Sequence, residues 1–171
     1  MAEIIKTYKE TLPALRVIGK RYTHADFDNG FGGKWGEWFA NDWFAPLDAL
    51  GTVEGIENGY LGFMRCDGAD DFEYWIGVFA APGTVVPDGY GFLDVDGGSV
   101  GICWVKGNQD DGSIYGMHDK CVEAMNENGM EHFRHDEDKY LCSFERYNCP
   151  RFTKADKDGN VILDYGIYLK E

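Results

Sequence analysis

The sequence has no long apolar run and comparatively few positive charges. No stretch approaches the roughly 20 consecutive apolar residues of a membrane-spanning helix, and residues 1–10 lack the apolar segment of a signal peptide. The chain carries 16 Lys and Arg against 30 Asp and Glu, which gives a formal net charge of -14. Because phosphate binding needs clustered Lys and Arg, this balance disfavours direct nucleic-acid binding and docking on an anionic membrane.

Paired cysteines are also missing. The five cysteines are odd in number, widely spaced and form no CxxC motif: Cys66, Cys103, Cys121, Cys142 and Cys149. Together with the missing signal peptide, this pattern predicts a reduced, cytoplasmic protein. No residues have convincing metal-ligand spacing, and no glycine-rich stretch has the register of a phosphate-binding loop. We therefore expect neither a metal nor a cofactor.

What the chain does contain is aromatic, strand-like sequence. Alternation and turn residues predict strands at residues 11–22, 60–66, 72–80, 90–95, 99–106, 140–147 and 161–170. Helical spacing begins at Lys34, where Pro46 is expected to kink or end the helix, and returns at residues 114–125. Gly129 is expected to cap that second helix.

This element order indicates one domain over residues 1–171, built from a strand-helix-strand-strand module written twice, at roughly 10–80 and 85–171. The expected class is α+β. The two modules form one curved antiparallel sheet with both main helices on one face, which leaves the other face for a ligand groove.

One carboxylate interrupts the apolar strand at residues 140–147. On a strand, alternate residues share a face, so Glu145 points the same way as Tyr147. A carboxylate in an aromatic setting is costly unless it is neutral, hydrogen-bonded or matched by a cation. Glu145 would then pair with a cationic ligand, or transfer a proton if its pKa is raised. It would be purely structural if it only bonds a tyrosine hydroxyl.

Several aromatic residues are candidates for the wall of such a site. Tyr147 would donate to Glu145 or line the cleft. Trp75 and Trp104 lie on strands, and the sequence does not decide which strand face meets the helices. Trp38, Phe39 and Tyr115 lie on helices, where core packing competes with a place beside the groove. The predicted ligand-binding set is Glu145, Tyr147, Trp104, Trp75, Trp38, Phe39 and Tyr115.

Three segments carry a resemblance to a known family. Residues 74–78 read YWIGV, residues 85–90 read VVPDGY and lead to GGSV at 97–100, and residues 144–147 read FERY. In this order they resemble the GyrI-like effector-binding domains, found in BmrR- and Rob-type multidrug-sensing regulators and in stand-alone integron-associated relatives. The likeness spans roughly residues 10–171.

The resemblance implies a duplicated SHS2-type module that binds lipophilic, often cationic, aromatic small molecules, with Glu145 at the base of the cleft. Two alternatives come with it. Some stand-alone relatives are cyclopropanoid hydrolases, for which Glu145 and Tyr147 would be catalytic and the role one of detoxification. Others are protein partners of the gyrase-inhibitor type. The regulators carry a helix-turn-helix domain ahead of this module, whereas here the module begins within ten residues of Met1.

Overall fold

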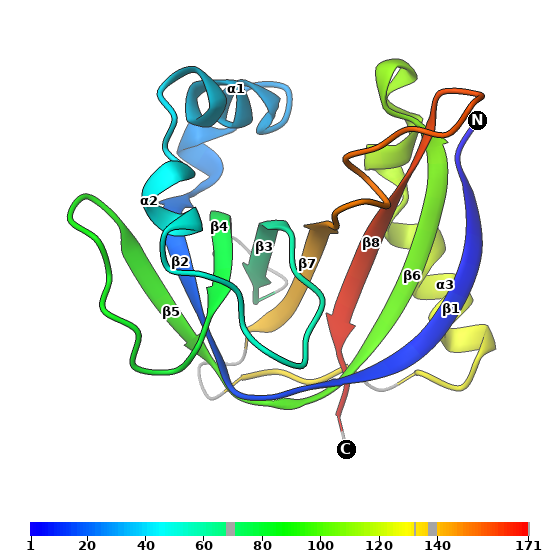
Figure 1. Ribbon diagram of the computed structural model, residues 1–171. Helices are drawn as coiled ribbons and strands as arrows, with labels where there is room; N and C mark the ends of the chain where they lie inside the picture. Colours follow the sequence, from blue (N-terminus) through cyan, green and yellow to red (C-terminus); the bar gives the residue numbers. More distant parts are fainter. Residues whose placement is uncertain (68–70, 132, 137–139, 171) are drawn as a thin grey trace.

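The computed structural model describes residues 1–67, 71–131, 133–136 and 140–170 (Figure 1). Eight strands form one antiparallel sheet in the order β1-β6-β8-β7-β3-β4-β2-β5. The strands are β1 Glu3–Leu12, β2 Leu15–Tyr22, β3 Tyr60–Cys66, β4 Phe72–Ala80, β5 Gly91–Val95, β6 Gly98–Asn108, β7 Leu141–Tyr147 and β8 Asn160–Tyr168. The helices are α1 Gly32–Ala40, α2 Ala45–Asp48 and α3 His118–Glu127, with single 3-10 turns η1 His24–Asp26, η2 Gln109–Asp111 and η3 Ser113–Gly116. This is the predicted α+β class with one curved, open antiparallel sheet.

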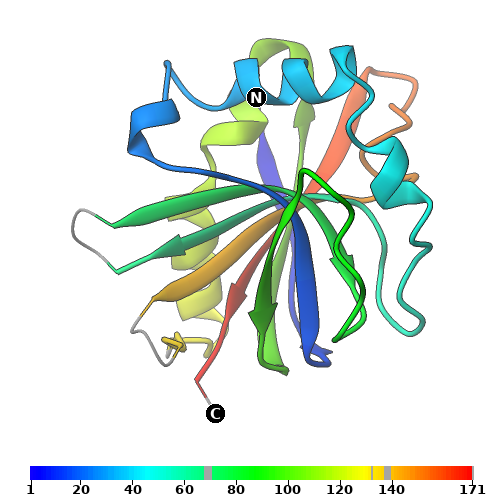
Figure 2. The same cartoon turned by 90° about the vertical axis from the view of Figure 1, so that its left-hand side faces the viewer.

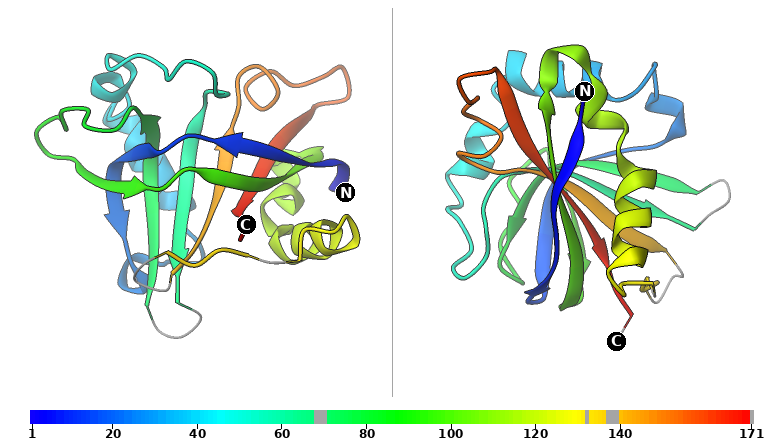
Figure 3. Two further views of the ribbon diagram at one scale, coloured as in Figure 1. Left: turned by 90° about the horizontal axis from the view of Figure 1, so that it is seen from below. Right: turned by 90° about the vertical axis from the view of Figure 1, so that its right-hand side faces the viewer.

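β3 and β7 pair at the middle of the sheet, and the long strands β1 and β6 bend visibly along it (Figures 1 and 2). α1 and α2 lie over the half made by β2, β3 and β4, while α3 packs along β6 and β1 at the other half (Figure 3). The division of the chain into repeats at 10–80 and 85–171 stays a prediction.

The N-terminal strand differs from the expected single strand at 11–22. β1 begins at Glu3, ends at Leu12 and pairs with β6, whereas β2 begins at Leu15 and pairs with β4 and β5. Pro13 lies between them. Proline lacks the N–H that a central ladder needs, so one continuous strand cannot run through this position.

Both helical predictions need correction at their ends. The first helix ends at Ala40, and Asp42, with a positive φ, follows it before Pro46 is reached. Pro46 instead lies in the first turn of α2, where a residue's N–H has no partner within the helix, so its absence costs nothing. The second expected helix is two elements, η3 and α3, separated at Met117. Gly129, with a φ of 79°, follows α3 in the left-handed conformation that favours glycine, as predicted.

The two faces of the sheet have different partners. The face bearing Glu145 packs against α1 and α2 through Tyr74 and Ile76, and against α3 through Cys103 and Tyr165. The opposite face carries an aromatic and aliphatic cluster that includes Phe63, Phe79, Phe144, Ile102 and Tyr168. Glu145 therefore lies on the helix-bearing face, which differs from the expected groove on the free face.

A buried ion cluster occupies the opposite face directly behind Glu145. Arg146 and Asp164 are both 0% exposed and lie 2.9 Å apart. Arg146 also contacts Glu10 at 3.0 Å and Glu57 at 3.2 Å, and Arg151 reaches Asp164 at 2.6 Å. Two arginines face three carboxylates in this cluster, so Arg146 is fully paired and committed to the far side of the sheet.

No helix within the described residues has the length and apolar character needed to cross a bilayer.

Candidate functional site

Strand register places Glu145 at the centre of the sheet. It pairs with Gly62 on β3 and with Tyr165 on β8. Tyr147, two residues on, shares its face and pairs with Tyr60. The site therefore lies where the two helix-bearing halves of the molecule meet.

Two tyrosine hydroxyls approach one oxygen of the Glu145 carboxylate. The Tyr147 hydroxyl donates to Oε2 at 2.7 Å, and the Tyr74 hydroxyl lies 3.4 Å from the same atom. Trp35 Nε1 on α1 donates to the Tyr74 hydroxyl oxygen at 2.9 Å. The Tyr74 hydroxyl oxygen accepts this hydrogen bond from Trp35, so the hydroxyl proton of Tyr74 remains available to donate to Glu145.

Gly62 leaves the space in which these groups meet. A Cβ at this position would lie 2.3 Å from the Tyr74 hydroxyl oxygen and 3.1 Å from Glu145 Oε2. Any side chain at residue 62 would therefore push the two groups apart. The requirement is steric and comes from the tight approach of Tyr74.

Glu145 is partly buried and lacks a basic partner: no ion pair joins it to a Lys, Arg or His within the described residues. Burial raises the pKa of Glu145 from 4.5 to about 7, against the lowering effect of the Tyr147 and Tyr74 hydrogen bonds. Both protonation states are therefore populated near neutral pH. In its ionised state the site carries an uncompensated negative charge among aromatic rings.

Tyrosines also border the site on the α3 side. Burial, and then the negative charge of Glu145, raise the pKa of Tyr115 on η3 and of Tyr165 on β8. The Tyr165 hydroxyl donates to the Ile114 carbonyl at 2.7 Å, which fixes its ring beneath η3. Tyr115 is 43% exposed, so it belongs to the rim rather than to the core.

The other sequence candidates lie in different places. Trp75 and Trp104 are on the opposite face, where Trp104 is the cross-strand neighbour of Asp164. The Lys6 Nζ and the Arg151 Cζ lie 4.4 and 4.2 Å from the centroid of the Trp104 ring. Trp38 is fully buried and donates to the Tyr22 hydroxyl at 2.9 Å. Phe39 on α1 is 62% exposed, and its ring centroid lies 6.4 Å from that of Trp35 and 5.5 Å from that of Phe44. Of the predicted set, the structure brings Glu145, Tyr147 and, at the rim, Tyr115 together.

Trp35, Tyr74 and Gly62 complete the site, although sequence reasoning did not select them. Trp35 lies on the same α1 stripe as Phe39. The Trp35 ring packs edge-on against the Tyr147 ring, with 4.8 Å between the ring centroids. Tyr74 shares a face with Ile76 by simple alternation, so its direction follows once the buried face is known. Gly62 has no sequence signal by itself, because its role depends on the partner strand.

A cavity of about 460 Å³ adjoins the site. It lies beneath α2 and the connection at 49–59, and its lining includes Tyr147 and Tyr60. Glu145 is not part of that lining. Tyr147 thus belongs to both features: it lines the cavity and donates to the carboxylate.

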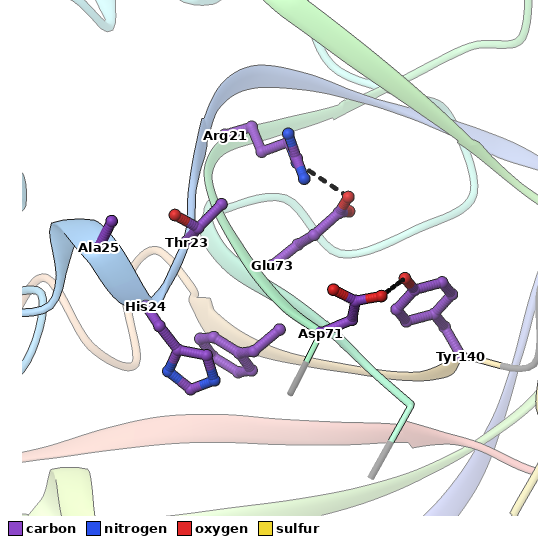
Figure 4. A pocket seen from close by; sticks show the side chains of 8 residues that line it. Arg21, Thr23, His24, Ala25, Asp71, Glu73 and Tyr140 are labelled. Atoms are coloured by element: carbon purple, nitrogen blue, oxygen red, sulfur yellow. Dashed lines mark hydrogen bonds and ion pairs between the residues drawn. The ribbon is translucent and has the colours of Figure 1, made fainter. Parts of the chain in front are cut away.

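A second cavity, of about 130 Å³, opens at the far end of β2 and β4 (Figure 4). Its charged groups are already engaged: Arg21 contacts Glu73 at 2.8 Å, and Asp71 accepts from the Tyr140 hydroxyl at 3.2 Å. It is smaller than the roughly 300 to 1,000 Å³ of typical ligand pockets. We therefore place the main candidate site at Glu145 and the larger cavity.

No family model matches the sequence. A search of curated proteins likewise gives no match. Solved structures do match over nearly the whole chain. SAV2435 bound to tetraphenylphosphonium aligns with a TM-score of 0.70 at 15% identity, covering 97% of this chain and 94% of that one. A protein of Staphylococcus aureus MU50 assigned to transcription regulation aligns with a TM-score of 0.69 at 15% identity, covering 98% and 99%.

EcmrR, in a complex with DNA, aligns with a TM-score of 0.60 at 12% identity; the match covers 97% of this chain and 57% of EcmrR. At these identities the likeness establishes the fold. The chain shares its fold with these proteins, in line with the α+β fold that the resemblance of its three segments to the GyrI-like domains implied.

Proposed function

We propose that this protein binds lipophilic cations, with the charge held at Glu145 and the apolar groups held by Trp35, Tyr74 and Tyr147. The observation that carries this proposal is the isolation of the carboxylate. Glu145 is surrounded by aromatic rings and has no basic partner within the described residues. A bound cation would supply the missing opposite charge.

The surrounding rings add attraction of a kind that tolerates varied ligands. A cation over a tyrosine or tryptophan face gains about 0.5 to 2 kcal/mol, depending on its desolvation. Tetraphenylphosphonium, the ligand in the SAV2435 structure, combines one positive charge with four apolar rings. That neighbour supports a ligand of the same chemical class here.

The proposal is tested by titrating the protein with tetraphenylphosphonium at about pH 8, where Glu145 is ionised. Quenching of tryptophan fluorescence, to which Trp35 contributes from within the site, and calorimetry give the affinity. We expect Glu145→Gln to weaken binding at least tenfold. Glu123→Gln removes the same charge from an exposed position of α3 and is the matched control. Equal affinities for the two variants would contradict the proposal.

A second candidate is hydrolysis of electrophilic natural products by the same carboxyl. The pKa of Glu145, raised to about 7 by burial, favours proton transfer near neutral pH, with Tyr147 holding the group in place. Turnover separates the two functions. An enzyme accumulates product beyond one equivalent and loses this in Glu145→Gln, whereas a binding protein protects its ligand stoichiometrically.

A further inference from the structure

The larger cavity has a composition of its own. Its wall is mostly apolar or aromatic and includes Leu47, Val53, Ile56, Val78 and Tyr60. No Lys or Arg lies in this lining. At about 460 Å³ it falls within the size range of small-molecule pockets. The cavity therefore offers apolar surface to a ligand.

The two carboxylates in the cavity wall are already engaged. Asp48 accepts a hydrogen bond from the Tyr60 hydroxyl at 2.9 Å. Glu57 pairs with Arg146 at 3.2 Å and with Arg151, and these contacts lower the pKa of Glu57. Neither acid is free for a ligand cation as Glu145 is. The cavity thus suits the uncharged part of a ligand, and the charged part belongs at Glu145.

Strand register joins the cavity to the carboxylate. Tyr60 and Tyr147 form one cross-strand pair, and Gly62 and Glu145 form the next pair on the same face. Residues two apart on a strand are separated by about 6.5 Å. The Tyr74 hydroxyl occupies the space above Gly62. Tyr147, which both lines the cavity and donates to Glu145, is therefore the residue that links the two features.

We propose that the natural ligand is elongated, with a cationic head at Glu145 and an apolar arm that passes Tyr147 into the larger cavity. This inference rests on the proposed function and adds a ligand class: quaternary ammonium or phosphonium compounds that carry one long apolar substituent. A compact cation uses only the Glu145 end. An uncharged apolar molecule of similar length uses only the cavity.

The test is a chain-length series of alkyltrimethylammonium ions, from tetramethyl through butyl to octyl, titrated by calorimetry. Burial of each methylene contributes about 0.8 kcal/mol, so affinity rises about fourfold per methylene until the cavity is filled. The readout is the ratio of the octyl to the tetramethyl affinity. Val78 on β4 and Thr52 in the connection at 49–59 both line the cavity, so Val78→Trp and Thr52→Trp should each fill it and lower this ratio at least tenfold. Val85→Trp, at a position 83% exposed, is the matched control.

The outcomes separate the two proposals. Glu145→Gln should weaken every member of the series by a similar factor and leave the ratio unchanged. If the affinities depend on Glu145 but the wild-type ratio is near one, or both tryptophan variants keep the wild-type ratio, the elongated-ligand inference is overturned and the proposed function stands. If no member binds, or Glu145→Gln binds all of them normally, both are overturned.

Discussion

Replacing Glu145 with Gln should stabilise the protein in a strongly pH-dependent way. The pKa of Glu145 rises from 4.5 in the unfolded chain to about 7 in the fold, mainly because of burial. Between these values the folded state keeps a proton that the unfolded state has lost, so wild-type stability falls as the pH rises. At about 1.4 kcal/mol per pH unit, this rise in pKa corresponds to about 3 kcal/mol of lost stability above pH 7. Gln cannot ionise and still accepts from Tyr147, so the variant does not suffer this loss.

Urea unfolding, followed by tryptophan fluorescence at several values between pH 4 and pH 8, measures the difference directly. Every other titrating group is common to both proteins, so subtracting the two profiles isolates Glu145. We expect similar stabilities near pH 4 and an advantage of about 3 kcal/mol for Glu145→Gln near pH 8. The exposed Glu123→Gln variant should run parallel to wild type. A constant difference across this range, or one that favours wild type at high pH, would refute the assignment of Glu145 as a buried acid without a countercharge.

Three further substitutions test one residue of the site and two residues on the opposite face of the sheet. Gly62→Ala should weaken tetraphenylphosphonium binding at least tenfold, because the new Cβ would lie 2.3 Å from the Tyr74 hydroxyl oxygen. The control is Gly36→Ala, in open space on α1. It should bind normally, and its unfolding free energy should rise by roughly 0.5 to 1 kcal/mol. Tyr168→Phe should raise the unfolding free energy by about 1 kcal/mol, since that buried hydroxyl has no hydrogen-bond partner within the described residues; a loss measured in urea would contradict this. Arg146→Leu should lower the unfolding free energy by about 3 to 5 kcal/mol, because the fully buried Asp164 loses a charge partner. A change below about 1 kcal/mol would contradict this and indicate that Arg151 compensates fully.

Alternation along β7 was enough to predict that Glu145 and Tyr147 share a face, and the structure confirms it. Periodicity also located most strands and the α+β class. The break at Pro13 was missed because residues on both sides of it are strand formers, and only pairing with different neighbours separates β1 from β2. The sequence predicts that Pro46 kinks or ends a helix, whereas it lies in the first turn of α2, because proline suits a first helical turn as well as it ends a helix.

The rest of the site depends on contacts between distant segments. Whether Trp75 or Tyr74 faced Glu145 was a choice between two adjacent residues on opposite faces, and the pairing of β4 with β3 decides it. The choice between Trp35 and Trp38 as the neighbour of Tyr147 depends on how α1 is rotated over the sheet. Such facts follow from the packing of the whole chain, and no local pattern contains them.

The position of Glu145 at the joint between β3 and β7 has a consequence for how this molecule would respond to its ligand. The groups around the carboxylate come from both ends of the sequence, from Trp35 in the first helix to Tyr165 in the last strand. Neither half alone can assemble the site, so separate fragments should be inert, and a molecule lodged there would link the melting of one half to that of the other.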